Sequence, residues 1–428
     1  MQDPHVKGSP KGGLWGATLG FFVGFAAVAL FGPTARSFRD AMGLDPQMVG
    51  WLVAMPALSG SILRIPFSAW VDTTGGRKPF LVLLSLSVLG MLGLTFLIQF
   101  WYPDHLGREL FWVVAALGVL CGCGIATFSV GISQVSYWFP QREQGWALGT
   151  YAGVGNLAPG IFSFLLPLVL THWGLSSAYW LWSCFLLAGT ALYFQTGRNA
   201  PYFQLREAGL SAAEARERAK ALGQELFPSG SMRESLVRSA RVWQTWALVG
   251  VYFTTFGGFI ALTAWFPTYW GQFFDAAAVT AGAWTATYSI LASAIRVPGG
   301  FLADRIGGER TAVFALTVTL VGAVILSWTH AYGWAVCGLL LMGAGMGITN
   351  AAVFKLVPQE VPEAVGGAAG WVGGLGAFGG FAIPPVMGWA VEHWGSGGYA
   401  RGFVTFVVLT LLSLGLIGLL ALHRRRTS

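Results

Sequence analysis

Two arginines, Arg64 and Arg296, lie inside stretches that are otherwise apolar. A guanidinium stays protonated at any accessible pH, and its insertion at the centre of a membrane costs about 2.5–3.5 kcal/mol on insertion scales. Its planar fork of N–H groups suits oxyanions, which accept two parallel hydrogen bonds. All 18 carboxylates can be assigned to loops or helix ends, so we expect no fixed counter-ion nearby. The pair predicts a site for an exchangeable anion; the alternative is that each arginine bonds backbone carbonyls or extends to an interface.

Both arginines open a repeated motif. Residues 64–76 read RIPFSAWVDTTGG and residues 296–308 read RVPGGFLADRIGG, so Arg, Pro, Asp and a Gly-Gly pair recur at an offset of 232 residues. A repeat with this long period predicts two copies of one multi-helix unit, with a site between them near the membrane midplane.

The composition is that of a membrane protein. Of 428 residues, 55% are hydrophobic and 10% are charged, whereas soluble domains carry about 25% charged residues. This excludes a soluble globule, and we expect no nucleic-acid partner despite the net charge of +7. No grouping of His, Cys and carboxylate residues has the spacing of metal ligands or of a catalytic site. We therefore expect a protein that is not an enzyme and that holds no metal or cofactor.

Apolar windows long enough to cross a bilayer recur twelve times. They cover residues 14–36, 48–70, 79–99, 111–138, 146–170, 178–196, 242–266, 278–302, 312–328, 333–357, 365–391 and 401–422. The predicted fold is an all-α membrane protein with two six-helix bundles, 1–196 and 242–428, related by pseudo-twofold symmetry. The polar segment 197–241 joins them as a cytoplasmic linker, in which Ser211 and Glu214 predict a capping box and a short helix.

The basic residues predict the orientation. If both termini are cytoplasmic, nineteen Lys and Arg residues lie in cytoplasmic segments and four on the other face, as the positive-inside rule requires. We expect a multi-pass protein of the inner (plasma) membrane, surrounded by lipid and functional as a monomer.

Two windows are unusually rich in glycine. Residues 149–156 and 366–380 contain glycines at small-xxx-small spacing, which lets membrane helices approach closely and slide. We expect these glycines to permit two bundles to rock against each other, although helix packing alone would also explain them. The candidates for this role are Gly153, Gly155, Gly370, Gly374 and Gly376.

These motifs resemble those of the major facilitator superfamily. Residues 72–78 and 300–307 are similar to its loop motifs after helices 2 and 8, although Ser68 and Thr73 depart from the pattern in the first copy. The resemblance implies that Asp72, Asp304 and Arg305 take part in ion pairs and helix caps that hold the cytoplasmic side shut.

The glycine-rich helices, together with residues 138–145 and 347–358, are similar to the narrower nitrate/nitrite porter family over nearly the whole chain. The resemblance implies that the two arginines grip the anion, that an asparagine adds a hydrogen bond and that aromatic rings enclose the ligand. The matching residues are Arg64, Arg296, Asn156, Phe128, Tyr252 and Phe256. From spacing alone, Tyr252 and Phe256 share a helix face and could equally be core aromatics.

Electrostatics favours exchange of anions. Two unpaired guanidiniums repel each other when the site closes without a ligand, so release of one anion is easiest when another replaces it. Every His falls in a loop or at an end, and no Asp or Glu lies mid-helix. We therefore expect nitrate/nitrite antiport by rocker-switch alternating access. Nitrate/proton symport and a porter for another small anion remain open, and a nitrate sensor is disfavoured because no added signalling domain is visible.

Overall fold

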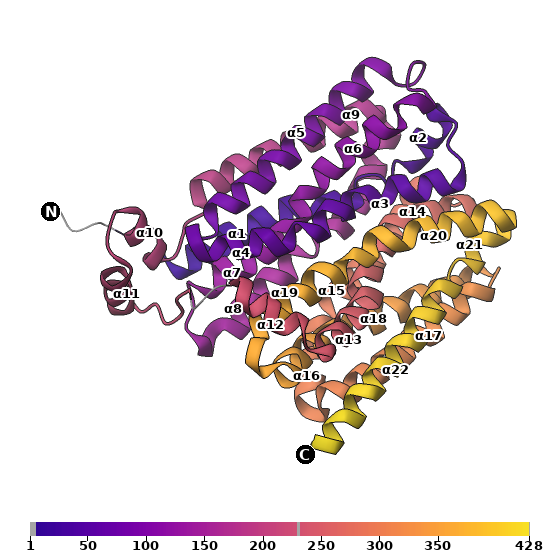
Figure 1. Ribbon diagram of the computed structural model, residues 1–428. Coiled ribbons are helices and arrows are strands. Elements are labelled where there is room, and N and C mark those ends of the chain that lie inside the picture. Colours follow the sequence, from indigo (N-terminus) through magenta and orange to yellow (C-terminus); the bar gives the residue numbers. More distant parts are fainter. Residues whose placement is uncertain (1–5, 229–231, 428) are drawn as a thin grey trace.

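A computed structural model describes residues 6–228 and 232–427, and the regular structure of these residues is helical. Figure 1 shows two groups of long helices side by side, with the described parts of both ends of the chain on one side of the molecule. We call this side the linker face, because it also carries α10 (Pro201–Glu207), α11 (Ala212–Ala221) and α12 (Met232–Ala240). The opposite side is called the distal face.

The first half contains six crossings, several of which are interrupted. Its helices are α1 (Pro10–Phe25), α2 (Ala35–Met42), α3 (Pro46–Ile62), α4 (Arg64–Thr74), α5 (Arg77–Trp101), α6 (Phe111–Gly122), α7 (Thr127–Ser136), α8 (Gln141–Gly155) and α9 (Ala158–Thr196). The pairs α3–α4, α6–α7 and α8–α9 each continue through a short break. Helix α9 contains a non-helical Gly174, with φ of 77°, which separates the fifth crossing from the sixth.

The second half repeats this plan. Its helices are α13 (Trp243–Tyr252), α14 (Gly258–Phe273), α15 (Ala278–Ala294), α16 (Arg296–Ile306), α17 (Gly308–Trp328), α18 (Tyr332–Glu360), α19 (Val365–Leu375), α20 (Gly379–Trp394), α21 (Gly398–Arg401) and α22 (Val404–Thr427). A π-helical turn, Phe253–Gly257, joins α13 to α14.

The twelve predicted crossings correspond to helices of the structure. Among the described residues, ten segments are long and apolar enough to span a membrane. One of these, Arg142–Thr196, contains two crossings, and α15 with α16 forms the remaining one. The predicted end of the first window at residue 36 was wrong, because the helix ends at Ala29, four residues before Pro33, and α2 follows separately.

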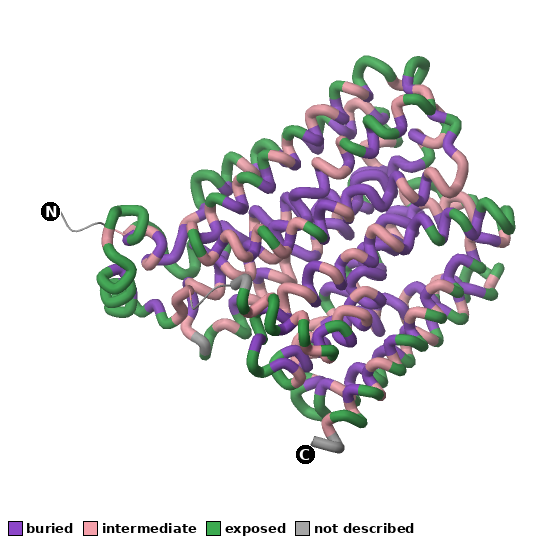
Figure 2. Tube along the Cα trace, in the orientation of Figure 1, coloured by how far each residue is buried: buried purple, intermediate pink, exposed green. Residues whose placement is uncertain are grey.

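The membrane-facing surface is apolar. Figure 2 shows exposed residues along the outer sides of the helices and buried residues between them. Large apolar side chains such as Trp112 (71% exposed), Phe100 (67%) and Trp328 (80%) occur on this outer surface. In water such exposure would be costly, whereas hydrocarbon accommodates it.

The linker is attached to both halves. Ser211 and Glu214 form the predicted capping box at the start of α11. Gln204 of α10 exchanges hydrogen bonds with the backbone of Lys7 at 2.8 and 2.9 Å, while Ser235 of α12 accepts a hydrogen bond from the backbone of Gly367 at 3.0 Å. The segment therefore spaces two bundles and also packs on each of them.

The two halves are sealed together at the distal face. A Cβ atom built on Gly50 of α3 would lie 2.6 Å from the carbonyl oxygen of Pro384, and one on Gly388 of α20 would lie 2.5 Å from that of Pro46. Only glycine permits such close backbone contact. Towards the linker face, by contrast, added Cβ atoms on Gly149 of α8 or Gly300 of α16 would meet no atom within 4 Å. The halves thus approach closely at the distal face and leave room at the linker face.

Candidate functional site

Each intramembrane arginine follows a helix break of the same shape. Arg64 follows Leu63, with φ and ψ of −70° and −14°, and Arg296 follows Ile295, with −69° and −12°. In both motifs a proline lies two residues further on and has no N–H to continue the helical hydrogen bonds. The Arg-x-Pro sequence therefore gives both arginines equivalent positions in the two halves.

The Arg64 side chain spans the interface between the halves. It is 1% exposed, its Nε donates to the Gly60 carbonyl at 3.0 Å, and its Nη1 donates across to the Gly373 carbonyl at 2.9 Å. Its Nη2 is buried without a hydrogen-bond partner. Arg64 thus bonds backbone carbonyls through Nε and Nη1, as the alternative interpretation of the sequence expected. Its Nη2 group remains available to donate to a ligand.

The two guanidiniums meet at one aromatic ring. Arg64 Cζ lies 5.2 Å from the centre of the Phe256 ring and 4.9 Å from that of Phe128. Arg296 Cζ lies 5.6 Å from the centre of the Phe256 ring. Within the described residues, neither arginine is in an ion pair with a carboxylate. Two positive charges from different halves therefore meet at Phe256, with Arg64 buried and Arg296 partly exposed.

Aromatic rings form the walls of this site. Phe128 and Phe256 lie 5.9 Å apart at 30°, and Tyr252 stacks on Phe256 at 4.9 Å and 13°. The predicted shared face of Tyr252 and Phe256 is confirmed by this stacking. The Tyr252 hydroxyl is close enough to both arginines to interact with their charges, but it is buried without a hydrogen bond of normal geometry.

Asn156 lies where α8 ends, next to the other half. Its backbone carbonyl accepts a hydrogen bond from Ser293 of α15 at 3.1 Å. Its side chain is 1% exposed, and both amide atoms lack a hydrogen-bond partner. A buried polar group without a partner costs about 1–3 kcal/mol. The amide of Asn156, the Tyr252 hydroxyl and Arg64 Nη2 are each buried donors without a partner, so each would gain from a hydrogen-bond acceptor.

Three residues near the site had no assigned role in the sequence analysis. Phe25 stacks on Phe256 at 6.5 Å and 10°, and Phe354 packs edge-on against Tyr252 at 5.2 Å and 89°. Asn350, one helical turn before Phe354, is buried with an unpartnered Oδ1. The four-residue spacing of Asn350 and Phe354 places them on one helix face and was visible in the sequence, but only packing shows what they touch.

The candidate glycines occupy different environments. A Cβ on Gly376 would lie 2.7 Å from the Tyr252 ring, and one on Gly374 would lie 2.7 Å from Ile65 of the other half. Gly155 is packed against the Phe21 ring, whereas Gly153 faces open space and Gly370 has an ordinary contact with Leu236. Gly155, Gly374 and Gly376 therefore lie at close contacts around the site.

The candidate gating residues lie towards the linker face. Tyr137 donates a hydrogen bond to Asp72 at 2.6 Å. Asp304 pairs with Lys355 of α18, and Arg305 is exposed. Each acidic residue of the repeated motif thus contacts a neighbouring helix of its own half. In the described part of the chain, no three His, Cys, Asp or Glu side chains converge as metal ligands would.

Comparison with known families agrees with this architecture. The sequence matches the family described as Major Facilitator Superfamily over residues 17–384, and a second match covers residues 276–428. The chain belongs to the major facilitator superfamily. Twelve crossings in two six-helix halves are the architecture of this superfamily, and the repeated motif lies at equivalent positions in the two halves.

Relatives within the superfamily cover nearly the whole chain. A protein of Thermus thermophilus named probable nitrate/nitrite antiporter NarK1 is 29% identical over 434 residues, which are 94% of this chain and 88% of the relative. The nitrite extrusion protein of Bacillus subtilis is 26% identical over 400 residues, which are 94% of this chain and 92% of that protein. The partially occluded inward open structure of the xylose transporter XylE from E. coli has a TM-score of 0.70 at 14% identity and covers 94% of this chain and 98% of its own. This last likeness shows the fold alone.

Proposed function

We propose that the protein is a secondary transporter that exchanges nitrate for nitrite between Arg64 and Arg296. The observation that carries the proposal is the site itself, where two guanidiniums from different halves share the Phe256 ring and have no carboxylate partner among the described residues. The names of the relatives from Thermus thermophilus and Bacillus subtilis support the choice of anions.

The donors fit a small planar oxyanion. Arg64 Nη2, the Tyr252 hydroxyl and the amide of Asn156 are buried donors without partners. Flat walls formed by Phe128 and Phe256 match a flat ligand better than a tetrahedral one. Nitrate and nitrite are planar, carry one charge and accept several hydrogen bonds. Bound between the arginines, either anion reduces their mutual repulsion.

The same electrostatics supports exchange. When the site is empty, closing both faces brings two unscreened charges together, and this opposes the return of the unloaded protein. A bound anion removes that penalty in both directions. The halves rock between the observed arrangement, sealed at the distal face, and one in which the linker face closes instead. The glycines that face open space, such as Gly153, leave room for that closure.

Orientation follows from charge. The linker face carries most of the basic residues outside the crossings, and we infer that it is cytoplasmic. The distal face then lies on the outer side of the plasma membrane. The site is formed within one chain, so a monomer is sufficient for the cycle.

We expect nitrate uptake into proteoliposomes to require nitrite or nitrate inside. Uptake without an internal anion should fall to the level of protein-free liposomes, because the unloaded site cannot return. A pH gradient should leave the rate unchanged. Nitrate uptake that persists without internal anion and collapses with the pH gradient would instead identify proton symport, and preference for another anion would identify a different porter.

The Tyr252 hydroxyl is expected to contribute one hydrogen bond to the anion. The Tyr252→Phe variant should bind nitrate about 5-fold more weakly, since a hydrogen bond is worth about 1 kcal/mol, while the stacking on Phe256 is kept. Titration of purified protein by calorimetry measures this affinity. Tyr202→Phe, in linker helix α10, is a matched control with wild-type affinity. Unchanged affinity of Tyr252→Phe would remove the hydroxyl from the site.

A further inference from the structure

A cavity opens between the two halves on the distal face, outside the seal. Its volume is about 80 Å³, and it is lined from the first half by residues of α2 and α3 and from the second half by residues of α14 and α15 and by Tyr399. Gly32 closes it on the inner side, where an added Cβ would lie 2.6 Å from the carbonyl oxygen of Ala264. A single water needs roughly 10–15 Å³ of such space, so the cavity can hold a small hydrated ion. We call it the vestibule.

The charged residues that line the vestibule are positive, and two of its polar side chains are buried donors. Arg36 and Arg39 are its two charged residues, and no Asp or Glu is among the residues that line it. Trp265 is 1% exposed, and its indole N–H has no hydrogen-bond partner; the Thr268 hydroxyl is also buried and unpartnered. A buried donor without an acceptor is costly. Two such donors beside two guanidiniums indicate an acceptor of negative charge.

The charge of the vestibule is only partly compensated. Asp40, which does not line the cavity, accepts from Arg39 Nε at 3.0 Å and from Arg39 Nη2 at 2.8 Å, and its other oxygen lies 3.6 Å from Arg36 Nε. One carboxylate thus serves two guanidiniums, so the group keeps a net charge of one positive unit. This charge matches a monovalent anion.

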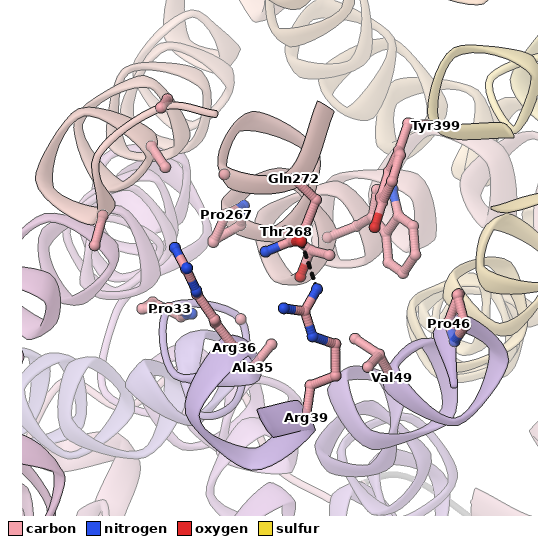
Figure 3. A pocket seen from close by; sticks show the side chains of 16 residues that line it. Pro33, Ala35, Arg36, Arg39, Pro46, Val49, Pro267, Thr268, Gln272 and Tyr399 are labelled. Carbon is pink, nitrogen blue, oxygen red and sulfur yellow. Dashed lines mark hydrogen bonds between the residues drawn. The ribbon is translucent and has the colours of Figure 1, made fainter. Parts of the chain in front are cut away.

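One hydrogen bond across the vestibule joins the halves. Arg39 Nη1 donates to the Gln272 side-chain oxygen of α14. Figure 3 shows this bond and the Gln272 amide nitrogen turned away from Arg39, towards the side of the cavity on which Arg36 lies. An anion in the vestibule would accept hydrogen bonds from Arg39 and from the Gln272 amide. It would then compete for the bond that ties the halves together at this face.

We propose that the vestibule is a second, weaker binding site for the transported anion, occupied before the distal seal opens. This rests on the proposed function for the identity of the anion. The site concentrates anions at the seal by its net charge, and occupation of Arg39 by the anion releases Gln272 and favours opening. The central site between Arg64 and Arg296 then receives the anion.

The test compares nitrate transport from the two faces in right-side-out and inside-out membrane vesicles. In the Arg36→Gln/Arg39→Gln double variant, the KM for nitrate presented at the distal face is expected to rise about 5-fold or more at low ionic strength, because steering by fixed charge is lost. The KM for nitrate presented at the linker face should stay within about 2-fold of wild type. Arg401→Gln serves as the control, since Arg401 lies outside the cavity, 5.8 Å from the ring centre of Trp394.

A second readout separates a charged binding site from a purely mechanical contact. The wild-type KM at the distal face should rise with salt concentration, because screening weakens attraction by exposed charges. In the double variant this salt dependence should be lost. Three results would each overturn the vestibule site: an unchanged distal KM in the double variant, equal KM shifts at both faces, or an unaltered salt dependence. None of them would contradict nitrate exchange itself. Absence of nitrate exchange by the wild-type protein in both vesicle orientations would overturn the proposed function, and with it the identity of the vestibule ligand.

Discussion

Arg64→Lys is expected to lower nitrate exchange at low nitrate concentration by about 100-fold, because two charge-assisted hydrogen bonds of about 1.5 kcal/mol each are lost. An ammonium is a point donor and cannot keep the contacts with the Gly60 and Gly373 carbonyls while also presenting a free N–H edge. Arg296→Lys should give a loss of similar size through its half of the anion site. Initial rates in proteoliposomes loaded with nitrite measure both effects.

A matched control for these variants is Arg108→Lys. Arg108 pairs with Asp45 at 2.8 Å on the distal surface, with 60% of its side chain exposed, and such surface pairs contribute little. Its exchange rate should equal that of wild type. Exchange at the wild-type rate in either Arg64→Lys or Arg296→Lys would contradict the proposed anion site, since it would show that bidentate geometry is not needed there.

Gly160→Leu and Gly153→Leu are each expected to slow exchange strongly, the first by keeping the distal face from closing and the second by keeping the linker face from closing. Both glycines lie on the fifth crossing, but a Cβ on Gly160 would already lie 2.9 Å from Ile290 Cγ1, whereas one on Gly153 meets no atom within 4 Å. Overpacking of a tight contact costs about 1–3 kcal/mol. Leucine at 160 therefore opposes the distal seal, while leucine at 153 fits the present arrangement and opposes closure of the linker face. Each should lower exchange at least about 10-fold.

Spin labels at Asp104 and Ser396, which belong to distal loops of the two halves, report the separation of the halves. The exposed Cys184 and Cys337 are replaced by serine in this background. In the presence of nitrate, Gly160→Leu should lengthen the label distance, and Gly153→Leu should keep it short. Normal exchange in both variants, or a shift in the same direction, would show that the two glycines do not act on opposite faces.

The sequence was sufficient for the features that depend on local pattern. The arginines, the prolines that follow them and the 232-residue offset predicted equivalent sites in two halves, and the helix breaks at Leu63 and Ile295 now explain why the arginines occupy those positions. The four-residue spacing of Tyr252 and Phe256 predicted their common face, which the stacking of the two rings confirms.

Features that arise from packing between distant segments could not be predicted from the sequence. The Gly373 carbonyl that anchors Arg64 is 309 residues away in sequence, and a backbone carbonyl carries no sequence signal. Phe25 and Phe354 are ordinary apolar residues of their helices until packing brings them to Phe256 and Tyr252. The asymmetry between the sealed distal face and the more open linker face likewise depends on how the halves are tilted, which no local pattern records.

The most direct test of the central claim is competition for labelled nitrate on the purified, full-length protein. Two guanidiniums, flat aromatic walls and buried unpaired donors predict a single class of tight central sites from which nitrite displaces nitrate readily and phosphate displaces it poorly. Phosphate binding tighter than nitrate binding, or undiminished nitrate binding in the Arg64→Lys/Arg296→Lys double variant, would contradict the account.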